Sequence, residues 1–164
     1  MSKTEKNLKE AFAGEAKAYI RLIAFAEKAE KEGYKQIAKL FRAVAEAEKI
    51  HAKNHLNLLG IINSTEENLK YSFEREKFAN EVAYPDFIKQ AEEEGNKMAV
   101  VSFVRARDVE EGHKKLYKLA LQHFMEEKET SYYLCKVCGY ISDNILPEEC
   151  PVCGAKKEMF EKIE

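Results

Sequence analysis

The sequence predicts an all-α protein, a bundle of four long helices followed by a small C-terminal metal-binding module. Two shifts in composition support this fold class. Residues 1–129 are rich in Ala, Glu, Lys, Leu and Phe, with apolar positions at helical spacing. All four Cys lie in the last 30 residues and all three Pro lie from Pro85 onward. We therefore expect a helical domain over residues 1–129 and a cysteine module over residues 130–164.

Capping and helix-breaking residues predict where the helices begin and end. A Ser followed three residues later by Glu can cap a helix, and Gly closes or interrupts one. The segment EEKETS, residues 126–131, loses the apolar periodicity and is interpreted as a hinge into the module. The apolar stripe of the second helix comprises Ile37, Leu40, Phe41, Val44 and Ala45. The boundary signals are, in chain order, Ser2 with Glu5, Gly33, Gly60, Ser64 with Glu67, and Gly95.

The helical part also repeats itself at an offset of about 62 residues, which predicts two copies of a helical hairpin. At an offset of 61, Phe12 and Glu15 fall on Phe73 and Glu76. The third helix therefore holds one residue more than the first, and we expect a π-bulge near Pro85 to absorb it. At an offset of 62, the matched pairs are Phe25 and Phe87, Ala29 and Ala91, Gly33 and Gly95, Phe41 and Phe103, Glu48 and Glu110, and His51 and His113.

Four Glu and two His fall at one level of these hairpins. Glu15 stands 18 residues before Gly33, and Glu48 and His51 stand 15 and 18 residues after it. An antiparallel helix pair brings such positions together. In each Glu-x-x-His, the i, i+3 spacing directs both side chains from one helical face. The second hairpin repeats the arrangement with Glu76, Glu110 and His113.

The joint pattern of these six residues predicts a dinuclear metal site. Burying four carboxylates together is prohibitive without a compensating cation. One Glu from each of two helices plus Glu-x-x-His from each of the other two is the ligand set of ferritin-like di-iron bundles. Imidazole and carboxylate suit iron or manganese, and zinc stays open. By contrast, His55, His123 and the phenylalanines are interpreted as surface or core residues.

The C-terminal module carries two Cys-x-x-Cys knuckles, each followed by Gly. A disulfide framework is disfavoured because the chain shows no export signal. About 34 residues bury too little core to fold alone, so a bound metal is expected to stabilise the module. Thiolates serve either zinc or iron, and the spacing does not decide between them. The expected ligands are Cys135, Cys138, Cys150 and Cys153.

The overall composition argues against two other classes of protein. Lys and Arg number 27 against 29 Asp and Glu, and the two signs are interleaved, so no basic surface is available for nucleic acid. No run approaches the roughly 18 apolar residues of a membrane span. The charged start MSKTEKNLKE lacks the apolar stretch of a signal peptide. We therefore expect a cytoplasmic protein that binds neither nucleic acid nor membranes.

Over nearly its whole length the chain resembles the rubrerythrin family. The motifs that carry the resemblance in the helical part are AFAGEAKAY, AEAEKIH, STEENL, AYPDF, AEEEGNK and EEGH. In the tail they are YYLCKVCGY and ECPVCG. The resemblance implies a ferritin-like four-helix bundle with two iron ions and a small C-terminal rubredoxin-like domain with one iron ion on four Cys. The implied activity is reduction of hydrogen peroxide, with electrons from reduced pyridine nucleotide arriving through reduced rubredoxin or a similar donor.

Carried over position by position, the resemblance implies the same ten ligands, with two departures near the bundle site. Most members have a further ligating Glu three residues after Glu76, where this chain has Ala79. Seven residues after Glu15 a Tyr is usual, and here stands Leu22. The missing Glu bears on the redox-linked ligand exchange of the family. The remaining ligands resemble those of bacterioferritin, and they are Glu15, Glu48, His51, Glu76, Glu110 and His113.

Three functions therefore stay open. The favoured one is a peroxidase in which the bundle irons reduce hydrogen peroxide and are re-reduced through the thiolate iron. The second is a ferroxidase or iron-handling protein that uses dioxygen. The third makes the tail a structural zinc ribbon and the bundle a binding module, which leaves the clustered carboxylates without a purpose.

The distance that the link between the second and third helices can span predicts a domain-swapped homodimer. In a ferritin-like bundle the second and third helices run parallel, so the chain must cross from one end of the bundle to the other. A second helix that runs to Gly60 ends roughly 13 Å below the metal level, and a third that begins near Thr65 starts roughly 16 Å above it. The four residues between them reach only about 14 Å. We therefore expect the first hairpin to pack on the second hairpin of a partner chain.

Overall fold

The computed structural model describes residues 2–124 and 129–164. The chain forms two compact units, Met1–Asn63 and Ser64–Glu164. Each unit contains one helical hairpin, and the second also carries the cysteine module. No helix within the described residues is both long and apolar enough to cross a membrane.

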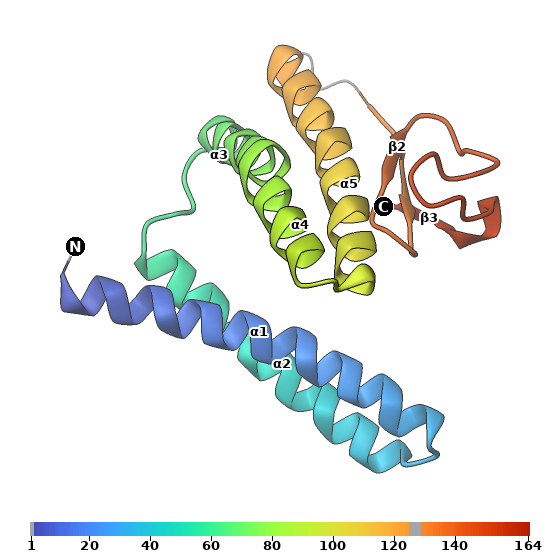
Figure 1. Ribbon diagram of the computed structural model, residues 1–164. Helices are drawn as coiled ribbons and strands as arrows, with labels where there is room; N and C mark the ends of the chain where they lie inside the picture. Colours follow the sequence, from blue (N-terminus) through green and yellow to red (C-terminus); the bar gives the residue numbers. More distant parts are fainter. Residues whose placement is uncertain (1, 125–128) are drawn as a thin grey trace. The chain divides into compact units, whose positions relative to one another are not determined.

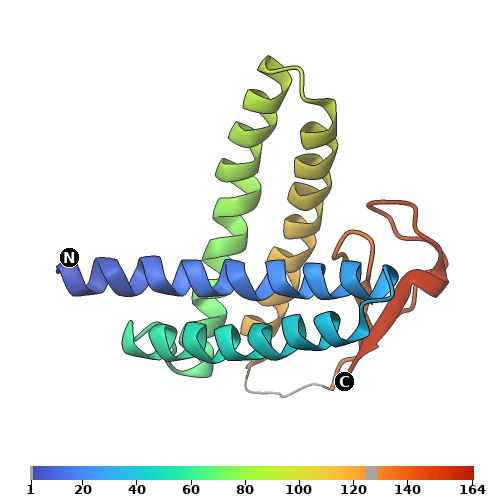
Figure 2. The same cartoon turned by 90° about the horizontal axis from the view of Figure 1, so that it is seen from below.

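The first unit is an antiparallel hairpin of α1, Lys3–Lys31, and α2, Lys35–Leu58 (Figures 1 and 2). The predicted N-cap is confirmed, because the Ser2 hydroxyl accepts the N–H of Glu5 at 3.1 Å. The predicted turn at Gly33 is also confirmed. This residue has φ +86°, a conformation that favours glycine.

Five alanines are buried in the first unit: Ala26, Ala29, Ala38, Ala45 and Ala52. Their small side chains let the two helices approach closely. The larger residues of the predicted stripe on α2 are not buried in the same way. Ile37 is 47% exposed and Leu40 56%. The hairpin therefore leaves much of its apolar surface uncovered.

The second unit begins with a long interrupted helix that runs beside α5 (Figure 1). Its parts are α3, Thr65–Phe78, the π-helix η1, Ala79–Ala83, and α4, Tyr84–Glu93. The returning helix α5 spans Lys97–Gln122. The predicted capping box at the start of α3 is confirmed, since the side chains of Ser64 and Glu67 each accept the other residue's backbone N–H. The predicted separation at Gly95 is confirmed as well, with φ +70°.

The π-helix confirms the predicted bulge near Pro85. The N–H of Tyr84 donates to the carbonyl of Ala79, five residues back. Pro85 follows at once and has no N–H of its own to donate. The extra residue is thus absorbed, and Phe87 meets Phe103 at a centroid distance of 5.7 Å. The matching rings of the first unit lie 5.8 Å apart, in agreement with the internal repeat.

The cysteine module folds around a three-stranded antiparallel sheet of order β2-β1-β3. The strands are β1, Tyr132–Cys135, β2, Ile141–Asp143, and β3, Phe160–Ile163, and the 3-10 helix η3, Lys157–Met159, leads into β3. Residues 126–128 of the predicted hinge lie outside the described residues. The boundary expected at residue 129 stays a prediction.

Candidate metal centres

The first unit brings together three of the six predicted bundle ligands. One ligand atom each from Glu15 on α1 and from Glu48 and His51 on α2 lie within 4.8 Å of one another. Nδ1 of His51 is 2.9 Å from a carboxylate oxygen of Glu48. About 3 Å is also the spacing of neighbouring ligands that each lie about 2.1 Å from one metal ion. The prediction that these three residues lie at the same level of the two antiparallel helices is therefore confirmed.

The second unit brings together the other three predicted bundle ligands. Ligand atoms of Glu76 on α3 and of Glu110 and His113 on α5 lie within 4.8 Å of one another. Nδ1 of His113 is 2.9 Å from a carboxylate oxygen of Glu110. This triad is better covered than the first, because the His113 side chain is 22% exposed and the His51 side chain 55%.

The charge state of the second triad fits a cation. Burial, a hydrogen bond to Glu110 and the negative charge of Glu110 raise the pKa of Glu76 to about 7. Two carboxylates held this close repel each other when both are ionised, and a divalent cation relieves that repulsion. The donor set of carboxylate and imidazole matches the preference of iron and manganese.

The orientation of His113 also fits a metal ligand. Its Nε2 lies 3.0 Å from the backbone carbonyl of Gly139. A carbonyl only accepts, so Nε2 carries the hydrogen, and a neutral ring then keeps the Nδ1 lone pair on the side of Glu110. Metal-binding histidines commonly donate their second N–H in this way, which holds the ring in one orientation.

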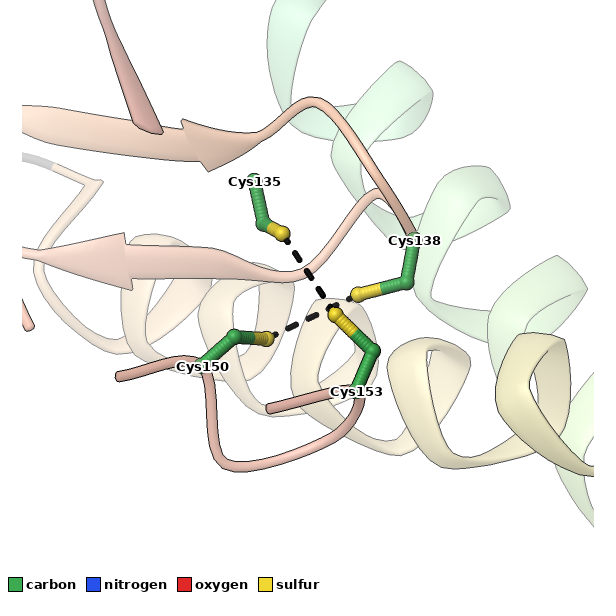
Figure 3. A group of neighbouring side chains, drawn as sticks. All are labelled: Cys135, Cys138, Cys150 and Cys153. Atoms are coloured by element: carbon green, nitrogen blue, oxygen red, sulfur yellow. Dashed lines mark hydrogen bonds between the residues drawn. The ribbon is translucent and has the colours of Figure 1, made fainter. Parts of the chain in front are cut away.

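The four predicted cysteines converge at the end of the sheet (Figure 3). All four are free thiols, so the disulfide alternative does not apply. The sulfur of Cys135 lies 3.8 Å from that of Cys153, and the sulfur of Cys138 lies 3.6 Å from that of Cys150. Sulfurs at about 2.3 Å from a tetrahedral metal lie about 3.8 Å apart, so the cluster has the size of a tetrathiolate site.

The two knuckles share one backbone design. Gly139 and Gly154 both have positive φ and follow the second Cys of their pair. Each turn aims backbone N–H groups at a sulfur. Burial acts to raise the pKa of Cys135, but hydrogen bonds from the N–H groups of Val137 and Cys138 outweigh it and lower the pKa. Burial dominates at Cys138 and raises its pKa.

The cysteine module contacts α5 next to the second triad. Val109 on α5 is 3% exposed, and its Cγ1 is 3.8 Å from the point where Gly139 would carry a Cβ. The ring of Tyr140 lies 3.9 Å from the point where Gly112 would carry a Cβ. The hydrogen bond between His113 and Gly139 joins the two predicted centres directly, since Gly139 follows Cys138.

Tyr84 lies beside the second triad and was not among the residues predicted from the sequence. Burial, and then the negative charges of Glu110 and Glu76, raise the pKa of its phenol. The internal repeat held a signal for it, because Tyr84 stands 62 residues after Leu22. The family resemblance places a Tyr at position 22, where this chain has Leu22. The equivalent position of the second hairpin does carry a Tyr, Tyr84.

Comparison with known protein families identifies both parts of the chain. Residues 6–121 match the family described as Rubrerythrin. Residues 133–161 match the domain described as the rubredoxin-like domain of rubrerythrin. The di-iron and four-cysteine donor sets described above fit the iron cofactors of this family.

Individual relatives cover almost the whole chain. A rubrerythrin of Porphyromonas gingivalis is 39% identical over 99% of this chain and 90% of its own length. A nigerythrin of Nitratidesulfovibrio vulgaris is 36% identical over 96% of this chain and 85% of its own. A solved structure of nigerythrin in its fully reduced, all-ferrous state matches with a TM-score of 0.61 and 34% identity, covering 99% of this chain and 88% of that one. This similarity supports the ferritin-like fold with a rubredoxin-like tail.

Proposed function

Because this chain belongs to the rubrerythrin family, we propose that it is a non-haem di-iron peroxidase that reduces hydrogen peroxide to water, with electrons relayed by an iron centre on the four C-terminal cysteines. The observation that carries the proposal is the hydrogen bond between His113 and Gly139. It links a carboxylate and imidazole triad to a tetrathiolate cluster through one peptide group. Such a link suits an enzyme that feeds electrons to a reactive centre.

The proposed bundle ligands are the two triads, and the proposed tail ligands are the four cysteines. The bundle metals supply the redox chemistry, in which H2O2 takes up two electrons and two protons to give two molecules of water. The four carboxylates of the two triads would balance the charge of two divalent ions. The N–H of His113 Nε2 holds its ring in place against the Gly139 carbonyl.

Tyr84 is the proposed proton-holding group beside the site. Its phenol oxygen carries its hydrogen at neutral pH, and the raised pKa strengthens this preference, so the O–H group is available as a donor. It lies near enough to Glu76 and Glu110 for their charges to act on it. We assign Tyr84 the role of orienting an oxygen ligand by hydrogen bonding.

The proposed electron supply is external. Reduced pyridine nucleotide would deliver electrons through reduced rubredoxin or a similar carrier to the cysteine centre. We place this activity in the cytoplasm, a reducing compartment in which cysteine thiolates stay available as metal ligands.

We further propose that the active form is a domain-swapped homodimer. The helix α2 ends at Leu58, two residues before the expected end at Gly60, and Ser64 caps α3 as expected. From His51 to Leu58, α2 covers about 10 Å, and from Thr65 to Glu76, α3 covers about 16 Å. The seven Cα steps between the two helices span at most about 25 Å. That falls short of the combined rise of about 26 Å, even before the sideways step between helices.

Anaerobic titration of the reduced, iron-loaded protein tests the function. We expect one equivalent of hydrogen peroxide to oxidise the bundle irons rapidly, and the absorption of the cysteine iron to report its later oxidation. Faster oxidation by dioxygen than by peroxide would instead indicate a ferroxidase, which the missing Glu at Ala79 also permits. Metal analysis that found only zinc on the cysteines and none in the bundle would reject both functions.

A further inference from the structure

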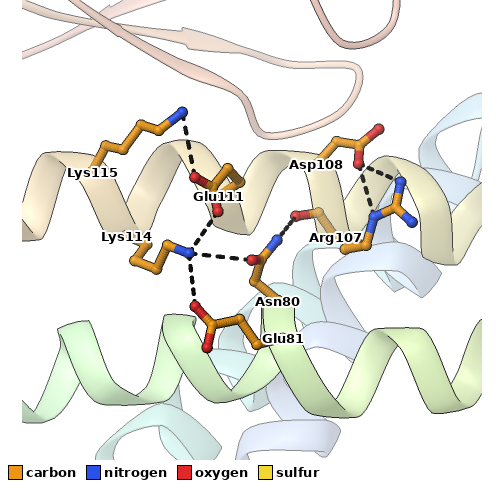
Figure 4. A network of polar contacts seen from close by, with 7 residues as sticks. All are labelled: Asn80, Glu81, Arg107, Asp108, Glu111, Lys114 and Lys115. Carbon is orange, nitrogen blue, oxygen red and sulfur yellow. Dashed lines mark hydrogen bonds and ion pairs between the residues drawn. The ribbon is translucent and has the colours of Figure 1, made fainter.

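A network of polar side chains connects the π-helix to α5 (Figure 4). Asn80 Nδ2 donates to the backbone carbonyl of Arg107 at 2.9 Å. The ammonium of Lys114 donates to the Asn80 side-chain oxygen at 3.4 Å and to Glu81 at 3.1 Å. It also pairs with Glu111 at 2.6 Å. Two of the five π-helical residues are thus tied to the neighbouring helix.

The network lies beside the second triad but does not contain it. Glu111 and Lys114 directly follow Glu110 and His113, and successive residues of an α-helix point about 100° apart. One face of α5 therefore carries the candidate metal ligands and an adjacent face carries the network. On the opposite helix, Asn80 stands one turn after Glu76.

The position of a π-bulge decides which way the flanking residues point. One inserted residue turns everything on one side of it by about 100° relative to the other side. While the bulge lies after Glu76, this carboxylate faces Glu110 and His113. A bulge that moved to a position before Glu76 would turn the carboxylate away from the triad.

We propose that Asn80 and Lys114 form a positioning clamp that holds the π-helix at Ala79–Ala83 and thereby keeps Glu76 in the metal-binding triad. The clamp is largely shielded from solvent at Lys114, whose side chain is only 18% exposed. Asn80 supplies both the donor for Arg107 and the acceptor for Lys114. The proposal rests on the proposed assignment of Glu76, Glu110 and His113 as ligands.

The chain offers a matched control for the test. Lys115 carries the same charge on the same helix and pairs with the same Glu111, at 3.4 Å, but it is 69% exposed. We compare Lys114→Met with Lys115→Met in the full-length protein with Zn²⁺ on its cysteines. Each is titrated with Mn²⁺, which prefers oxygen and imidazole ligands to thiolates. The free Mn²⁺ is measured by electron paramagnetic resonance.

We expect Lys114→Met to weaken Mn²⁺ binding by about tenfold or more, as is common when a group that orients a ligand is removed. Amide hydrogen exchange at Ala79–Ala83 should accelerate in the same variant, without added metal. Lys115→Met should resemble the unmodified protein in both measurements, and Lys114→Arg should restore binding.

Equal Mn²⁺ affinity in the two methionine variants would overturn the clamp. So would weaker binding with unchanged exchange at the π-helix, because the loss of affinity would then not act through the position of the bulge. If Lys114→Met does not fold, Asn80→Ala carries the same test, since it breaks two contacts of the clamp and removes no charge. Failure of the unmodified protein to bind any Mn²⁺ would refute the ligand assignment itself.

Discussion

At the scale of single residues, the two candidate histidines differ in what holds their rings. The His113 ring is held at Nε2 by the Gly139 carbonyl, and its Nδ1 lies 2.9 Å from a carboxylate oxygen of Glu110. His51 contacts Glu48 through Nδ1, and its side chain is 55% exposed. The family resemblance implies that the histidine at position 51 exchanges with a Glu on the third helix, the residue that Ala79 replaces here.

We predict that His51 stays on its iron in both oxidation states of this protein. The methyl group of Ala79 cannot reach a metal, so no carboxylate competes with the imidazole. Crystal structures of the oxidised and reduced forms measure this directly. Restoring the carboxylate with Ala79→Glu should bring the exchange back, and Ala79→Gln serves as its uncharged control. A His51 that leaves the metal on oxidation in the unmodified protein would refute the prediction.

The raised pKa of Glu76 predicts how the stability of the metal-free protein depends on pH. Its folded value of about 7 lies above the ordinary value of 4.5, so the folded state binds more protons between these two values. The contribution of this group to stability is therefore present at low pH and is lost as the pH rises through 7.

Urea unfolding of the metal-free protein at pH 5 and pH 8 tests this effect, with Glu76→Gln as the reference. The unmodified protein should lose stability relative to the variant between the two pH values. Added Mn²⁺ should reverse the trend, because metal ions bind the ionised carboxylate. A difference between the two proteins that does not change with pH would contradict the raised pKa.

Cys138→Ser tests the proposed relay at a single atom. The change removes one of four sulfurs from the cluster and should abolish turnover that depends on an external electron donor. The bundle, reduced chemically beforehand, should still consume one equivalent of peroxide. Stopped-flow absorption measures both reactions. Undiminished steady-state turnover in the variant would show that electrons reach the bundle by another route.

At the scale of elements, α5 serves three purposes on different faces. It supplies two candidate ligands, anchors the π-helix through Lys114, and contacts the cysteine module through Val109. The last of these contacts places the Gly139 carbonyl on His113.

We predict that Val109→Ala slows electron transfer from the cysteine centre to the bundle. The change removes two buried methyl groups beneath Gly139 and should cost about 2 kcal/mol of packing free energy. Val101→Ala on the same helix is the matched control, since Val101 is 44% exposed. The rate is read from the absorption of the cysteine iron after peroxide is added.

The absorption spectrum and iron content of the cysteine centre should not change in either variant, because all four sulfurs remain. Equal transfer rates in Val109→Ala and Val101→Ala would mean that this contact does not set the electron path.

At the scale of the whole molecule, each hairpin carries half of the proposed di-iron site and leaves apolar residues uncovered. Phe25 of the first unit is 47% exposed and Phe87 of the second is 43% exposed. Two hairpins packed as a four-helix bundle would cover such surfaces and complete the ligand set. The short link between α2 and α3 favours a bundle built from two chains.

Mixing two inactive variants tests the domain swap. We predict that Glu48→Ala and Glu110→Ala, unfolded together and refolded, recover part of the activity. In a swapped heterodimer one site carries both lesions and the other site carries none. Each variant refolded alone is the control. A mixture that remains as inactive as its components would favour a bundle closed within one chain.

The sequence by itself determined the features that depend on local spacing. Helix caps, the turns at Gly33 and Gly95, the π-helix and the members of each candidate metal cluster follow from helical periodicity and from residues a few positions apart. The apolar stripe on α2 was identified, but its burial was not, because burial depends on what packs against it.

Outside the candidate metal clusters, only the tertiary structure decided which groups meet across elements. His113 and Gly139 are 26 residues apart in the sequence, and Asn80 and Lys114 are 34 apart. Tyr84 likewise joins the second triad through the packing of α4 on α5. Such contacts depend on the distance and angle at which helices and the cysteine module pack, and these are set by side chains that interlock over a whole interface. A pattern of neighbouring residues carries no information about that geometry.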